Sequence, residues 1–140
     1  MPMRYFRRFR DHDSGTSAVE FALISPIFIV LLLGIICFSA VLSTYNAVQQ
    51  IAAEAARAAL PGLSAAEQSQ LAQNYVTSVI GNYGLLDPSK LTVSTSAQAT
   101  TFTVTATYNM SGSFFMTLGG FLVTASPLII RSAAIQTGGF

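Results

Sequence analysis

The chain has 140 residues, of which 9% are charged and 51% are hydrophobic. An ordinary soluble domain carries about 25% charged residues. A disordered tail needs low hydrophobicity and a high net charge, so this composition excludes one. The net charge of +1 gives no basic excess for nucleic-acid binding, and a single cysteine excludes a disulfide scaffold. The length admits one small domain with a tail or an anchor.

The charges are concentrated at the N-terminus. Residues 1–15 carry a net charge of +2, because four arginines outweigh Asp11 and Asp13. The arginines are Arg4, Arg7, Arg8 and Arg10. The next charge is Glu20, and 33 uncharged residues then separate it from Glu54. The sequence therefore begins with a short basic leader that is followed by a long uncharged stretch.

The uncharged stretch contains an apolar run of 22 residues from Phe21 to Leu42. As a helix this run measures about 33 Å, which matches the ~30 Å core of a bilayer. Its few interruptions are of kinds that membrane helices tolerate, namely Ser25, Pro26, Gly34 and Ser39. We predict a single transmembrane helix.

Other interpretations of an apolar N-terminal segment fit less well. Buried core helices rarely run for 22 residues without a charge. A cleavable secretory signal is the stronger alternative, with a loose cut site at Val41–Ser43, but its apolar region should be only about 7–15 residues long. A lipoprotein signal at Cys37 would need a small residue before the cysteine, where this chain has Ile36. Cys37 is more simply a small apolar residue of the helix.

The arginines also predict the orientation of the helix. Four precede the span, whereas only Arg57 lies within about 15–20 residues after it. The positive-inside rule therefore places residues 1–15 in the cytoplasm and residues beyond about 43 outside it.

The junction before the span has a distinctive pattern, in which Glu20 follows Gly15 by five residues and stands at the edge of the apolar helix. A carboxylate at this position is costly without a partner, although Glu20 could simply lie among lipid headgroups near Arg10. A basic leader, a glycine, this glutamate and an apolar helix together resemble the processing site of type IV pilin-like proteins. The resemblance implies that a prepilin peptidase cuts between Gly15 and Thr16. Glu20 would then neutralise the new amine of a neighbouring subunit.

The closer resemblance is to TadE-like proteins of the tight-adherence (Flp, type IVb-like) pilus system. It rests on the segments 7–9, 18–23, 32–36, 52–59 and 103–108, together with Gly15 and Pro26. The resemblance implies a pseudopilin-like minor subunit, single-pass in the bacterial inner membrane, with a role in cell adhesion. The partners it implies are the membrane, prepilin peptidase and other pilin-like or Tad assembly subunits, in a homo- or hetero-oligomer formed through the N-terminal helix.

Two departures from the family pattern keep its relatives TadF and TadG open as subtypes. Many members carry an acidic residue late in the span, where this chain has Cys37. The C-terminal strand is also unusually apolar around 127–130.

Beyond the span, a small α+β domain is expected. Residues 43–60 contain neither Pro nor Gly, so the helix should continue to Pro61–Gly62, although a break near Ser43–Thr44 is the alternative. One face of this extension carries small or aliphatic side chains, namely Val48, Ile51, Ala52, Ala55, Ala56 and Ala59. Ser64 and Glu67 form a capping box that begins a second helix, with its apolar stripe at Leu71, Tyr75, Val76, Val79 and Ile80.

An antiparallel sheet of about three strands should follow. The expected strands are 91–97, 101–108 and 122–134, and in the second of these Thr alternates with apolar residues. Pro127 predicts an edge position or a bulge in the third strand. We expect a short helical turn at residues 113–118 and a frayed end at residues 136–140. The predicted organisation is a leader (1–15), a membrane helix with its extension (16–60) and an extracytoplasmic α+β head (61–140).

The residues offer little catalytic chemistry. The single histidine, His12, lies in the leader, and the carboxylates after the span are Glu54, Glu67 and Asp87. We therefore expect no enzyme activity, no cofactor and no metal site. Two functional classes remain: a structural or assembly subunit of a pilus machine, and an uncleaved single-span protein whose head binds an envelope partner or a glycan.

Overall fold

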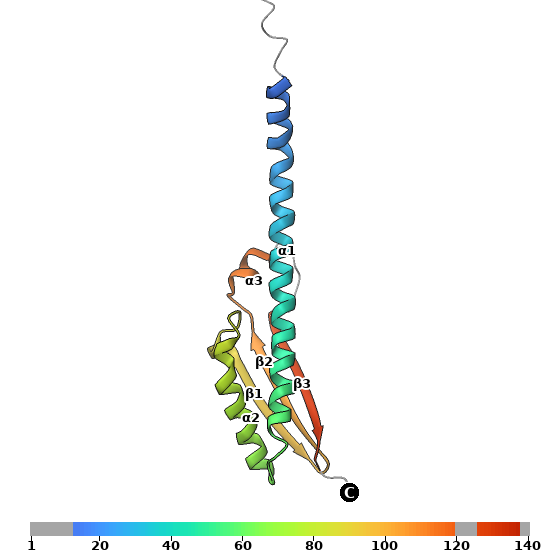
Figure 1. Ribbon diagram of the computed structural model, residues 1–140, viewed down its shortest axis with the longest axis vertical. Helices are drawn as coiled ribbons and strands as arrows, with labels where there is room; N and C mark the ends of the chain where they lie inside the picture. Colours follow the sequence, from blue (N-terminus) through green and yellow to red (C-terminus); the bar gives the residue numbers. More distant parts are fainter. Residues whose placement is uncertain (1–12, 120–125, 138–140) are drawn as a thin grey trace, which may run out of the picture. The chain divides into compact units, whose positions relative to one another are not determined.

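The computed structural model describes residues 13–119 and 126–137, so the leader arginines lie outside the described residues. The chain forms two compact units, Met1–Ile36 and Cys37–Phe140. The elements in chain order are α1 (Asp13–Ala58), α2 (Ala65–Val79), η1 (Ile80–Asn82), η2 (Pro88–Lys90), β1 (Leu91–Gln98), β2 (Thr101–Asn109), α3 (Phe114–Gly119) and β3 (Leu128–Gln136). Figure 1 labels the three α-helices and the three strands. We call the second unit the head; it takes in α1 from Cys37 onwards. The mixed α+β class is as expected.

Helix α1 is continuous from Asp13 to Ala58. The hydroxyl of Thr44 donates to the Ala40 carbonyl at 2.8 Å, so the polar pair Ser43–Thr44 does not end the helix. Pro26 also lies inside the helix. The alternative of two helices with a break near residue 43 is therefore wrong.

The core of the head forms where α1 meets the sheet. Every residue of the predicted small-residue face is buried, and Val48, Ile51, Ala52, Ala55 and Ala59 are fully so. They share one cluster with Ala72 and Val76 of α2 and with Phe102 and Val104 of β2. Burial of the large side chains around these alanines stabilises the contact.

The second helix begins at the predicted cap. The Glu67 amide donates to the Ser64 hydroxyl at 3.2 Å, and the Glu67 carboxylate accepts from the Leu63 amide at 2.9 Å. The carboxylate thus reaches the residue before the cap. The most buried positions of α2 are Gln68, Ala72 and Val76, so the buried face lies partly beside the predicted stripe.

The sheet is antiparallel with the order β1-β2-β3. In the central strand the predicted face, Phe102, Val104, Ala106 and Tyr108, is buried under the helices. The opposite face carries the threonines at 101, 103, 105 and 107. The period-2 pattern of the sequence therefore assigned both faces correctly.

The third strand begins at Leu128, and residues 122–125 of the predicted strand lie outside the described part of the chain. It pairs with β2 from Leu128, opposite Asn109, to Gln136, opposite Thr101. Pro127 precedes the strand because it has no N–H to donate, and its carbonyl accepts from the Met110 amide at 2.7 Å. β3 lies at an edge of the sheet, as the proline predicted. The predicted fraying was wrong for Gln136, which belongs to β3, and for Thr137, whose amide donates to the Thr100 carbonyl at 2.9 Å. Residues 138–140 lie outside the described part of the chain.

Candidate membrane segment and processing site

The first half of α1 exposes apolar side chains on all sides. Large hydrophobic residues at successive positions from Phe21 to Leu33 are between 37% and 73% exposed. A soluble core helix buries these residues, and an amphipathic one buries a single stripe of them. The interpretation as a buried core helix is therefore wrong for this segment, which is long and apolar enough to cross a membrane.

The residues of the predicted processing site lie at the beginning of this helix. Gly15 and Thr16 are exposed and stand in the first turn of α1, which starts at Asp13. Both residues that flank the predicted cut are thus exposed.

Glu20 follows Thr16 by four residues, about one helical turn, and its side chain is exposed. Within residues 13–119 and 126–137, the one ion pair is that of Glu54 with Arg57, at 2.8 Å, and it does not involve Glu20. Of the other residues predicted for the span, Phe21, Pro26 and Leu42 are exposed and Gly34 is half-buried. The helix thus presents an exposed carboxylate next to an exposed apolar surface.

The last turns of the apolar run belong to the head. Cys37 is only 1% exposed, and Ala40 and Val41 are also buried, whereas Phe38 and Leu42 remain exposed. Sequence reasoning assigned all of Phe21–Leu42 to the lipid and missed this packed face. The small side chains Cys37 and Ala40, three residues apart, were the signal that one side of the helix is approached closely.

Polar contacts connect the loops at this end of the head. The Asp87 amide donates to the Tyr108 hydroxyl at 3.0 Å, and the Lys90 ammonium donates to the Ser111 carbonyl at 3.1 Å. The side chain and the amide of Ser89 both donate to the Asp87 carboxylate, and with a smaller contribution from Lys90 they lower the pKa of Asp87 below its ordinary value. These bonds hold the loop between α2 and β1 against the end of β2.

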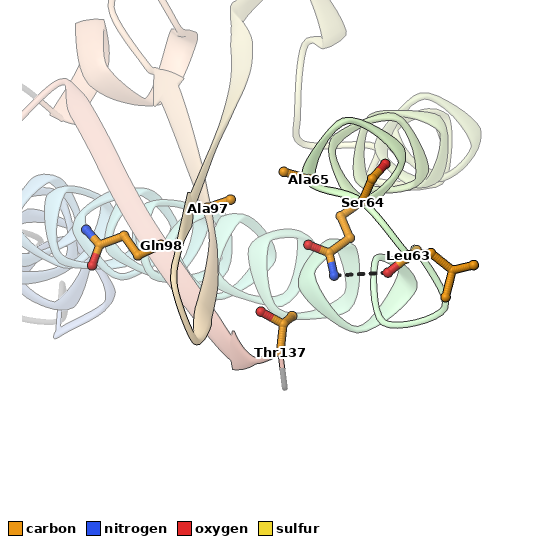
Figure 2. Close-up of a pocket in the computed structure, with 8 residues that line it drawn as sticks. Leu63, Ser64, Ala65, Ala97, Gln98 and Thr137 are labelled. Carbon is orange, nitrogen blue, oxygen red and sulfur yellow. Dashed lines mark hydrogen bonds between the residues drawn. The ribbon is translucent and has the colours of Figure 1, made fainter. Parts of the chain in front are cut away.

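An open hollow of about 410 Å³ lies at the opposite end of the head, where α1 passes into α2 (Figure 2). In it the Gln68 side-chain amide donates to the Gly62 carbonyl at 3.2 Å. The lining residues are Gly62, Leu63, Ser64, Ala65, Gln68, Ala97, Gln98 and Thr137. No charged side chain lines it, so it offers a ligand no ionic contact.

The face of the sheet that points away from the helices carries hydroxyl and amide side chains. Thr92, Thr107 and Ile130 lie in one row across the three strands, and Ser94, Thr105 and Ser132 in the next. The hydroxyls of Thr105 and Ser132 are 2.9 Å apart. The face has no charged residue, because Arg131 belongs to the other face, where its guanidinium lies 4.9 Å from the ring centre of Tyr45.

The fold defines a class of protein in which one long apolar helix, of a kind that indicates membrane anchoring, leads into a small α+β domain. Residues 15–57 match the model of a family described as TadE-like protein, which confirms the resemblance over that segment. The matched segment covers the predicted processing site, Glu20, the span and nearly all the rest of α1. No curated protein and no solved structure matches the chain.

Proposed function

We propose that this protein is a pseudopilin-like minor subunit of a tight-adherence (Flp) pilus machine, anchored by one transmembrane helix with its N-terminus in the cytoplasm. The observation that carries the proposal is the exposed apolar surface of α1 with Glu20 at its edge, within the segment that matches the TadE-like family. The role is structural rather than enzymatic, and it is exercised in the bacterial inner membrane.

Processing by a prepilin peptidase is the first step of the proposed mechanism. The leader keeps residues 1–15 inside because its arginines resist translocation. Cleavage between Gly15 and Thr16 removes a net charge of +2 and creates a positive amine on Thr16. The remaining chain has four acidic and three basic side chains. The new amine is then the basic group nearest to Glu20 along the chain.

Lateral packing of α1 is the second step. A neighbouring helix displaced by about 6 Å along its axis, the rise of four residues, would bring its Glu20 to the Thr16 amine of the first copy. In a low-dielectric environment such a pair is costly to separate, because each unpaired charge would remain desolvated. Glu20 would thus set the register of subunits whose apolar faces pack together.

A matched pair of variants tests the register role. We expect Glu20→Gln to insert normally and to reduce strongly the recovery of assembled pili, because the amine loses its partner. Glu54→Gln makes the same chemical change at an exposed pair, which contributes only about 0.3–0.5 kcal/mol, and should assemble like the wild type. Equal assembly of both variants would show that Glu20 has no register role.

A second candidate function is an uncleaved single-span protein whose head binds an envelope partner or a glycan. The uncharged hydroxyl face of the sheet favours it, because hydroxyls spaced along strands can bond to a neutral polar ligand. The two candidates differ in the fate of the leader. A chain that keeps residues 1–15 in cells with an active peptidase supports the second candidate and contradicts the first.

A further inference from the structure

Exposed apolar side chains gather at the end of the head that contains α3. Phe114 is 69% exposed, and Leu118, one turn later on the same side of α3, is 39% exposed. Met116 points the other way and packs against the core. Leu128 and Ile130, at the start of β3, are exposed as well. We call Phe114, Leu118, Leu128 and Ile130 the apolar rim.

The contacts within the head place the apolar rim at the same end of the head as the first residues of its α1 segment. A small hollow brings Ser43 and Ala47 of α1 together with residues 82–86. The chain continues from there to Asp87, which bonds Tyr108 near the end of β2, and then to Lys90, which bonds Ser111 just before α3. The opposite end of the head holds Gly62 and the β1–β2 turn. The apolar rim is therefore at the end of the head where its α1 segment begins, and Figure 1 shows α3 at this end.

The burial of α1 residues within the head indicates how deep the end with the apolar rim lies in the bilayer. Cys37, Ala40 and Val41 belong to the apolar run, yet they are buried within the head. From Cys37 to the end of the run at Leu42 a helix rises about 7.5 Å. Amphipathic segments that lie in a membrane interface bury their apolar side by about 5–10 Å. The end of the head that contains the buried Cys37 therefore lies at the depth of an interfacial segment.

The composition of this end suits lipid. Residues 110–119 and 126–130 contain no charged side chain. The nearest cations are already engaged, since Lys90 bonds the Ser111 carbonyl and Arg131 stacks on Tyr45. Exposing the apolar rim to water costs free energy in proportion to its area, and insertion among acyl chains removes that cost.

We propose that the apolar rim is a membrane-docking surface, which inserts into the outer leaflet of the same bilayer that α1 crosses. The occupant is phospholipid, at the boundary between headgroups and acyl chains. This inference rests on the proposed single-span anchoring. It adds a second attachment, which holds the head against the membrane before the subunit is extracted into an assembly. Its strength scales with the apolar area inserted.

The absence of tryptophan from the sequence allows a direct test. Three single-tryptophan chains are placed in phosphatidylethanolamine–phosphatidylglycerol vesicles: Phe114→Trp in the rim, Leu63→Trp at the opposite end of the head, and Phe28→Trp in the span. Leu63 is the matched control, because it is 96% exposed. Fluorescence is quenched either by a phospholipid with a nitroxide high on its acyl chain or by aqueous acrylamide.

We expect the lipid nitroxide to quench Phe114→Trp several times more strongly than Leu63→Trp, and acrylamide to show the reverse order. Leu118→Trp gives the same readout if Phe114→Trp does not fold. Equal behaviour of the rim and control tryptophans would overturn the proposal. A rim tryptophan shielded from both quenchers would overturn it too, because a second copy would then cover the rim.

The span tryptophan separates the two possible failures. If Phe28→Trp is quenched by a lipid nitroxide deep in the bilayer while Phe114→Trp behaves like Leu63→Trp, only the docking surface is wrong. If Phe28→Trp is accessible to acrylamide, the single-span anchoring itself is wrong, and the docking surface with it.

Discussion

Gly62 and Gln68 are packed so closely that a β-carbon on Gly62 would lie 2.8 Å from the backbone nitrogen of Gln68. The Gln68 side chain also donates to the Gly62 carbonyl, at 3.2 Å. This contact closes the turn between α1 and α2, and it explains why a buried glutamine sits in the first part of α2. The glycine is required here by close approach and not by an unusual backbone angle.

Gly62→Ala should therefore destabilise the head by about 1–3 kcal/mol, the usual range for an overpacked site. Thermal unfolding of the full chain in detergent micelles, followed by circular dichroism, measures the effect. Gly81→Ala is the control, because nothing lies within 4 Å of a β-carbon at that position. A Gly62→Ala chain that unfolds at the same temperature as Gly81→Ala would contradict the close approach.

Replacing a buried alanine of α1 tests the small-residue face. Ala52→Leu adds three carbon atoms to a fully buried position and should cost about 1–3 kcal/mol of stability. Ala66→Leu makes the same change at an exposed position of α2, where we expect less than about 0.5 kcal/mol. Equal unfolding midpoints for the two variants would show that the face is not packed as described.

The acid dependence of stability should report on Asp87. Hydrogen bonds from Ser89, with a smaller contribution from Lys90, lower the pKa of Asp87 below its ordinary 3.8. A carboxyl group whose folded pKa is lowered stabilises the fold above its unfolded pKa, and this contribution disappears as the pH falls through the folded pKa. The difference in unfolding midpoint between wild type and Asp87→Asn should thus shrink on acidification below 3.8. A difference that stays constant with pH would contradict this role.

Local sequence patterns predicted most of the fold. Alternation in residues 101–108 identified both faces of β2, Ser64 and Glu67 marked the start of α2, and the alanine face of α1 was identified from its helical spacing. These features depend on neighbours in the chain, so their signal is local. Ser126 and Pro127 were predicted inside the third strand but precede it, because the ladder is set by the pairing of Leu128 with Asn109, a partner distant in sequence.

The features of the candidate site also separate into those that local sequence predicted and those that depend on distant contacts. The exposed apolar helix and Glu20 follow directly from the residue order. The burial of Cys37 and the gathering of Phe114 and Leu128 at one end depend on how the loops fold back, which no periodicity encodes. Gln68 was missed for a similar reason, because its hydrogen-bond partner Gly62 lies outside the helix.

The most direct test of the proposed function is the intact mass of the protein purified from membranes of cells that contain an active prepilin peptidase. A chain that begins at Thr16 is the predicted result, and a variant with Gly15→Leu should keep its leader. Gly34→Leu, a matched change inside the span, should still be cut. A wild-type chain that retains residues 1–15 would contradict the account.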